Sequence, residues 1–166
     1  MAATDEMVEI AQEILPEFCC IVPEKREEIT TEGGLNVSGQ IPLLTSVVKR
    51  LHAAKIQVSF FITPSLEHVH ASHQCAADCI ELHTGAYASA SDKDRAVFLD
   101  ELFVAAEWAH SLGMRVNAGH GLTYSNVKPI IQIPYLYELN IGHSIVSRAV
   151  FVGLQEAVSE MKHLII

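Results

Sequence analysis

A histidine with a glycine on either side is the strongest candidate for chemistry in this sequence. His120 lies in the segment Val116–Tyr124 (VNAGHGLTY), where a short apolar run leads into a turn. Glycine permits tight backbone geometry and close approach to a ligand, and imidazole exchanges a proton near neutral pH. We therefore expect His120 to act as an acid or base. The alternative is a buried, hydrogen-bonded structural histidine.

The same N-x-G-H pattern occurs a second time, at the end of the next apolar run. Asn117–His120 (NAGH) and Asn140–His143 (NIGH) are the two copies. The second copy precedes the last helical segment, and the free amide groups at a helix N-terminus favour anions. Barrel enzymes often bind phosphate with the loops after their last two strands, so at the end of a barrel Gly121, Gly142 and His143 would be candidates for binding a phosphate group. An ordinary turn between a strand and a helix is the alternative.

Two further polar side chains are expected on one side of a third strand. Side chains two residues apart in a strand point the same way, which applies to Glu81 and His83. Glu81 is expected to stabilise positive charge or take a proton, and burial would raise the pKa of its carboxyl group. A structural ion pair is the alternative.

The remaining histidines and cysteines give weaker signals. His68, His70 and His73 resemble a metal cluster, but only His70 and His73 share a helical face, so we expect a solvated helix surface. The cysteines form two close pairs without zinc-finger spacing: Cys19 and Cys20, and Cys75 and Cys79. Cys19 and Cys20 should point to opposite faces of a strand, and packing is the favoured role for both.

Alternating strand and helix patterns must position these residues. The pattern predicts a helix with Thr4 as its N-cap, followed by five βα units. The expected helices cover residues 4–14, 42–54, 65–76, 92–112, 125–131 and 147–164, and the expected strands cover 18–22, 56–62, 79–83, 114–118 and 137–141. Residues 24–40 are expected to form a long loop. Strands joined by helical crossovers form a parallel sheet.

Such a sheet either stays open and doubly wound or belongs to a closed barrel. Polar residues stand at the ends of four of the five expected strands: Thr30 and Thr31, Glu81 and His83, His120, and His143. A (β/α)8 barrel gathers all its strand ends around one mouth, whereas an open sheet binds its ligand at one switch point. We therefore favour one domain, residues 1–166, that is part of a TIM barrel.

Composition excludes several classes of protein. The 166 residues carry a net charge of −9, 49% hydrophobic and 19% charged residues. Proteins that bind nucleic acids or anionic membranes need clustered lysine and arginine, so neither partner is expected. The residues after Met1 lack the basic and apolar regions of a secretory signal. We expect a cytoplasmic protein with reduced thiols.

Four segments resemble the pyridoxine 5'-phosphate synthase family. They are Phe18–Leu35 (FCCIVPEKREEITTEGGL), Ile80–Tyr87 (IELHTGAY), Val116–Tyr124 (VNAGHGLTY) and Glu138–His143 (ELNIGH), and they occur in the family's order. The resemblance spans essentially the whole chain. It implies a (β/α)8 barrel that condenses 1-deoxy-D-xylulose 5-phosphate with 3-amino-2-oxopropyl phosphate. The products are pyridoxine 5'-phosphate, inorganic phosphate and water, and the reaction needs no metal or organic cofactor.

The resemblance also implies roles for particular residues. His120 would be the proton donor and Glu81 a transition-state stabiliser, while Thr30 would contact the deoxyxylulose phosphate. Gly121, Gly142 and His143 would hold the amino-ketone phosphate. Family members are cytoplasmic homo-oligomers, commonly octamers. They begin with two further βα units and a third strand before the equivalent of Met1, and these carry a catalytic histidine and glutamate. We therefore expect this chain alone to be inactive.

Two other readings remain open at this point. A metal-dependent sugar-phosphate aldolase or epimerase would use Glu81, His83, His120 and His143 as metal ligands. A non-enzymatic flavodoxin-like binding module would use the five strands as a complete open sheet.

Overall fold

A computed structural model describes residues 1–24 and 33–166 of the chain. Its centre is a sheet of five parallel strands, whose carboxyl ends lie at the same edge. The strands are β1 (Phe18–Ile21), β2 (Gln57–Ile62), β3 (Cys79–His83), β4 (Arg115–Gly119) and β5 (Leu136–Asn140). Glu81 pairs with Phe61 of β2 and Asn117 of β4 in this register. The expected strands are confirmed to within one or two residues.

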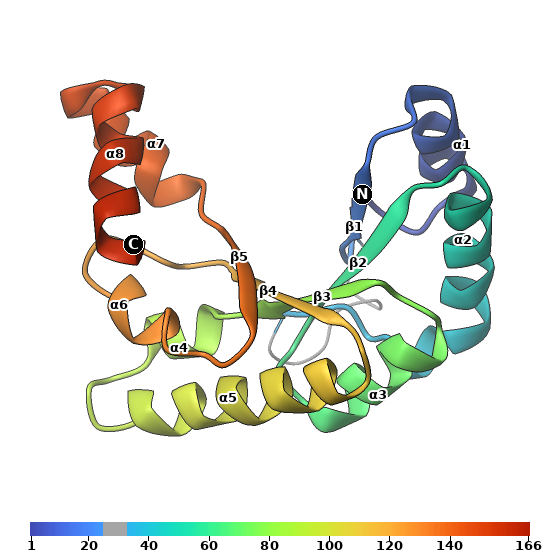
Figure 1. Cartoon of the computed structure of the whole chain (residues 1–166), viewed down its shortest axis with the longest axis horizontal. Helices are drawn as coiled ribbons and strands as arrows, with labels where there is room; N and C mark the ends of the chain where they lie inside the picture. The colour runs from blue at the N-terminus through green and yellow to red at the C-terminus, as the bar shows by residue number, and fades with distance from the viewer. Residues whose placement is uncertain (25–32) are drawn as a thin grey trace.

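Helices connect the strands and leave one face of the sheet open. They are α1 (Asp5–Ile14), α2 (Ile41–Ala53), α3 (Leu66–Gln74), α4 (Gly85–Ser89), α5 (Arg95–Ser111), α6 (Val127–Ile130), α7 (His143–Val152) and α8 (Leu154–Ile165), with a short 3-10 helix, Ser38–Gln40. Helices α2, α3 and α5 lie outside the curved sheet, and the two ends of the chain rise on either side of its hollow face (Figure 1). The hollow face carries the polar residues of the strands.

The strand order separates the two architectures that the sequence leaves open. The five strands follow one another in the order β1-β2-β3-β4-β5 without a reversal. A doubly wound flavodoxin-like sheet reverses its strand order at a switch point, whereas a barrel adds each strand beside the previous one. The winding is therefore that of a barrel, and the flavodoxin-like reading is wrong.

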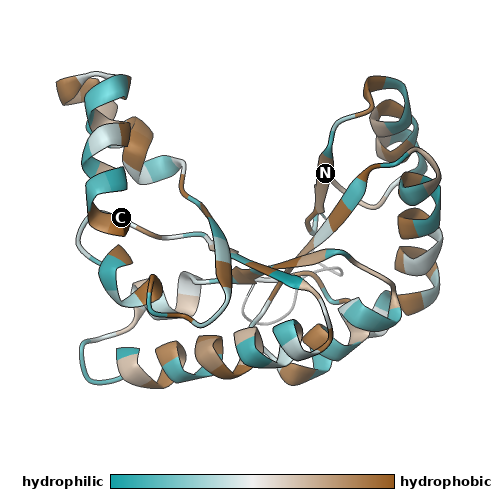
Figure 2. Cartoon of the chain, viewed as in Figure 1, coloured by the Kyte–Doolittle hydropathy of each residue, from teal (hydrophilic) through white to brown (hydrophobic). Residues whose placement is uncertain are grey.

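Alternation along the strands separates an apolar face from a polar one. Ile21, Val58, Phe60, Ile80 and Leu82 are fully buried beneath the outer helices. Their neighbours on the hollow face include Cys20, Ser59, Glu81 and Asn117, which line a common cavity of about 350 Å³. Apolar residues, drawn in brown, occur along the strands and on parts of the surrounding helices (Figure 2). Burial of the apolar face stabilises the packing of the helices on the sheet, and the polar side chains of the other face line a cavity.

Three helical segments differ from the expectation, and one of them is the 3-10 helix Ser38–Gln40, which lies within the expected loop 24–40. The short helix α4 was not predicted, since its sequence GAYAS lacks a full period of apolar residues. The expected helix 147–164 begins earlier and is two helices, because Gly153 between them has φ 85° and ψ 154°. That conformation is accessible to glycine and interrupts helical hydrogen bonding. By contrast, the N-cap prediction is confirmed, because the Thr4 side chain accepts a hydrogen bond from the Met7 amide.

Other expectations concern the cysteines and membranes. All four cysteines are free. Among the described residues, no helix has the length and apolar character needed to span a bilayer.

Candidate active site

The site begins with two stacked imidazoles at the edge where the strands end. The ring centroids of His83 and His120 lie 4.6 Å apart with an interplanar angle of 26°. The ring of Phe61 meets His83 edge-on at 5.0 Å. The Gly85 amide donates to Nδ1 of His83 at 3.3 Å, so a neutral His83 carries its proton on Nε2. Burial, together with the neighbouring His120, lowers the pKa of His83 to about 4.

His120 stands on a strained turn that Thr84 fixes. Its φ is 81° and that of the following Gly121 is 77°, both in the left-handed region. The buried Thr84 hydroxyl lies 2.8 Å from the carbonyl oxygen of Gly119 and 2.6 Å from that of His120. Non-glycine residues adopt such a backbone where the surroundings hold it, frequently at functional sites. The imidazole is thereby presented at the surface of the hollow face.

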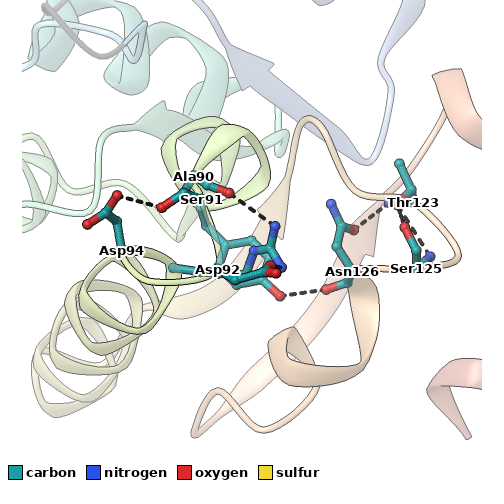
Figure 3. Close-up of polar contacts among 9 residues, drawn as sticks. Ala90, Ser91, Asp92, Asp94, Thr123, Ser125 and Asn126 are labelled. Carbon is teal, nitrogen blue, oxygen red and sulfur yellow. Dashed lines mark hydrogen bonds and ion pairs between the residues drawn. The ribbon is translucent and has the colours of Figure 1, made fainter.

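A second set of contacts fixes the loop that carries His120. The side chain of Asn126 accepts from the Thr123 amide at 2.7 Å and donates to the Gly121 carbonyl at 3.1 Å. Ser125 contacts the Thr123 hydroxyl at 2.9 Å (Figure 3). The loop is therefore closed on itself by its own polar side chains.

Glu81 is held from two other strands. Its Oε2 accepts from Asn140 Nδ2 at 2.8 Å, and the Cys20 thiol donates to the same oxygen at 3.7 Å. Gly119 makes room for it, because a Cβ there would lie 2.7 Å from Glu81 Oε1. Burial is the main cause that raises the pKa of Glu81, and the bonds from Asn140 and Cys20 oppose it. The ion pairs of the described residues do not include one between Glu81 and His83.

The second N-x-G-H turn opens directly into helix α7. Gly142 is the N-cap of α7 and His143 its first residue. The Ser144 hydroxyl donates to the Leu122 carbonyl at 2.7 Å, which ties this turn to the loop after β4. The two repeated turns therefore lie side by side.

One cavity of about 610 Å³ brings most of the predicted residues together. Its lining includes Glu81, His120, Gly121, Gly142 and His143. His83 lines an adjoining cavity of about 370 Å³ with His120 and Gly121. Thr30 and Thr31 lie outside the described residues. The arrangement offers a carboxylate, an imidazole and a helix N-terminus around one space, which suits acid-base chemistry on an anionic substrate.

Sequence reasoning missed three residues of this arrangement. Cys20 was assigned to packing, yet its thiol contacts Glu81, and burial raises its pKa to about 12. Cys19 is buried on the opposite face of β1, as expected. Asn140 was noted only as the first residue of the second N-x-G-H copy and Thr84 only as part of the segment Ile80–Tyr87, without a role for either side chain. Their roles depend on contacts between segments far apart in the sequence.

The structure also tests the expected exposure of the α3 histidines and the alternative of a metal site. His70 and His73 are exposed as expected, whereas His68 is buried, so the solvated-face expectation is wrong for His68. Within residues 1–24 and 33–166, no three histidine, cysteine or acidic side chains form a group that could hold a metal ion. Glu81, His83, His120 and His143 accordingly do not form a ligand set.

Comparison with known proteins adds independent evidence. Two of the solved structures that match this chain illustrate the shared fold. One is the xylose isomerase domain protein from Planctomyces limnophilus, with a TM-score of 0.57, 15% identity, and 96% of this chain and 66% of that chain covered. The other is the citrate synthase SbnG, with a TM-score of 0.56, 14% identity, and 98% and 69% covered. The fold is thus α/β and TIM-barrel-like, and the described residues form an incomplete barrel of five strands.

Sequence comparisons identify the family. Pyridoxine 5'-phosphate synthase from Photobacterium profundum is 55% identical over 163 residues, which cover 98% of this chain and 67% of that protein. The enzyme of that name from a Synechococcus species is 56% identical, with 98% and 68% covered. The chain thus spans about two thirds of the length of these relatives. The model of the family "Pyridoxal phosphate biosynthesis protein PdxJ" matches residues 1–166, and this chain belongs to that family.

Proposed function

We propose that this chain provides the site at which pyridoxine 5'-phosphate synthase closes the pyridine ring. The substrates would be 1-deoxy-D-xylulose 5-phosphate and 3-amino-2-oxopropyl phosphate, and inorganic phosphate and water would leave. The observation that carries the proposal is the cavity of about 610 Å³, which is lined by Glu81, His120 and the turn before α7. Both substrates are small phosphorylated molecules, and a space of this size suits such ligands.

The amino-ketone phosphate would bind between the two N-x-G-H turns. Gly121 and Gly142 lack side chains, so a phosphate can approach their backbone closely. The N-terminus of α7 supplies amide groups and a partial positive charge, and the His143 imidazole is exposed beside it. Such local donors would offset the repulsion between a phosphate and a chain with a net charge of −9.

His120 would donate the proton and Glu81 would stabilise positive charge. Condensation eliminates water, and a hydroxyl group needs a proton to leave as water, which an imidazole supplies near neutral pH. The Glu81 carboxylate is partly withdrawn from water, and a charge acts more strongly there than in bulk solvent. The neutral His83 stacks on His120 and keeps the ring in place.

The test is the formation of pyridoxine 5'-phosphate from the two substrates. The purified chain is assayed alone and mixed with the part of the Photobacterium profundum relative that lies outside the match. We expect product in the mixed sample and not from the chain alone, and absence of product from both samples overturns the proposal. In the active sample, His120→Gln should lower kcat by about 10²- to 10⁴-fold. His73→Gln, on the exposed face of α3, is the matched control and should keep the full rate.

A further inference from the structure

Side chains from three non-adjacent strands meet at the Glu81 carboxylate. Cys20 comes from β1, Glu81 from β3 and Asn140 from β5. In the parallel register Glu81 lies level with Asn117, but its Oε1 reaches Gly119, which is two residues nearer the carboxyl end of β4. The side chain therefore leans toward the mouth where His120 stands.

The two oxygens of the Glu81 carboxylate have different surroundings. The hydrogen bonds from Asn140 and from Cys20 both end on Oε2. Among the described residues, no hydrogen bond ends on Oε1, which faces the gap left by Gly119. A carboxylate with one oxygen anchored has its plane and direction fixed, while the other oxygen remains able to accept from a ligand.

We propose that Asn140 and Cys20 are positioning residues that hold Oε2 of Glu81, so that Oε1 is the oxygen presented to the reacting substrate. The proposal rests on the function proposed above, and it assigns a role to two residues outside the predicted site. Cys20 acts as a hydrogen-bond donor and not as a nucleophile, since its pKa of about 12 keeps the thiol protonated.

The two hydrogen bonds on Oε2 should affect the pKa of Glu81. Hydrogen bonds to an ionised carboxylate favour the ionised form, so their loss raises its pKa. The other titratable or charged groups that share cavities with Glu81 include Cys20 of β1, His120 after β4, Arg115 of β4 and Glu138 of β5, along with Cys79, Tyr137 and His143. Among these, Glu138 raises the pKa of Glu81 by charge repulsion, and the variants below leave it in place.

The two N-x-G-H repeats supply a matched control. Asn140 and Asn117 occupy the same position of the repeat, and Asn117 pairs in register with Glu81 on the adjacent strand. Asn140 donates to Glu81, whereas the described contacts include no hydrogen bond from Asn117 to it. The same substitution at these two positions therefore separates a specific hydrogen bond from a general change in polarity.

The experiment is a carboxyl-carbon NMR titration of the chain with labelled glutamate, in which Glu81→Gln assigns the Glu81 signal. We expect Asn140→Ala to raise the Glu81 pKa by about 1 unit, and Asn140→Asp to raise it further through like-charge repulsion. Cys20→Ala should raise it less, and Cys20→Ser should restore the donor. If Asn140→Ala changes this pKa no more than Asn117→Ala does, the proposal is overturned.

This measurement requires no turnover, so it is independent of the proposed function. In the sample that forms product, Asn140→Ala should lower kcat more than it changes KM and move the acidic limb of the kcat profile up with the measured pKa. A limb that stays in place while the NMR pKa moves would overturn the positioning role. Full activity of Glu81→Gln would instead contradict the proposed function, whatever the titration shows.

Discussion

His83 stacks on His120 with ring centroids 4.6 Å apart, although one residue ends strand β3 and the other stands on the turn after β4. Two imidazoles at this distance disfavour a charge on both, and the buried His83 has its pKa lowered to about 4. Protonation of His83 in acid should therefore destabilise the folded state.

We predict that His83 makes the folded state less stable in acid. Its pKa falls from 6.5 to about 4 on folding, so the unfolded chain takes up the proton first. The stability that the neutral ring contributes is present above pH 6.5 and is lost as the pH falls toward 4. Each pKa unit corresponds to about 1.4 kcal/mol, and halving the total for solvent screening beside the open cavity gives a loss of about 1.7 kcal/mol.

The measurement is denaturant unfolding across this pH range, in the native chain and in His83→Gln. Carboxylates titrate in both proteins, so the difference between them isolates His83. Parallel curves for the two proteins would contradict the prediction.

The equivalent glycines of the two repeats should respond differently to alanine. A Cβ at Gly119 would lie 2.7 Å from the Asn140 carbonyl oxygen and from Glu81 Oε1, whereas a Cβ at Gly142 would meet no atom of the described residues within 4 Å. Gly119→Ala should lower the folding stability by about 1 to 3 kcal/mol, because the Asn140 backbone would have to shift to make room for the methyl group. Gly142→Ala, with φ −111°, should have little effect on unfolding. Equal unfolding midpoints for the two variants would disprove the steric account.

The buried Thr84 hydroxyl should hold the strained turn at His120. Thr84→Val keeps the shape of the side chain but leaves the carbonyl oxygens of Gly119 and His120 without this donor. We expect a loss of about 1 to 3 kcal/mol, together with faster amide hydrogen exchange in the loop after β4. Thr84→Ser retains the hydroxyl and should recover most of both. A valine variant as protected as the native chain would show that the turn does not depend on Thr84.

The break between α7 and α8 should depend on Gly153. Its φ of 85° with ψ of 154° lies in a region that is essentially confined to glycine. Gly153→Ala should therefore lower the unfolding free energy by about 1 to 3 kcal/mol, measured by urea denaturation. Phe151→Ser, at an exposed position of α7, is a control for general change in this helix and should matter less. A stable Gly153→Ala protein would mean that the two helices can rearrange at the break.

Local sequence determined the elements and the main candidates for chemistry. The apolar run at residues 79–83 gave a strand with the expected bounds, and Thr4 caps the first helix as predicted. His120, between two glycines, and the repeated N-x-G-H turns were visible because backbone geometry and residue type coincide at those positions. Such features depend on interactions within a few residues, so pattern alone reveals them.

Only the tertiary structure decided which side chains meet. Glu81 lies 61 residues from Cys20 and 59 from Asn140, and their contacts exist because the curved parallel sheet directs alternate side chains into one hollow face. The choice between a barrel-type and a doubly wound sheet likewise depended on strand order, which periodicity does not encode. The left-handed backbone of His120 is held by Thr84 from a different strand connection. These features come from packing between distant segments, and no local pattern specifies them.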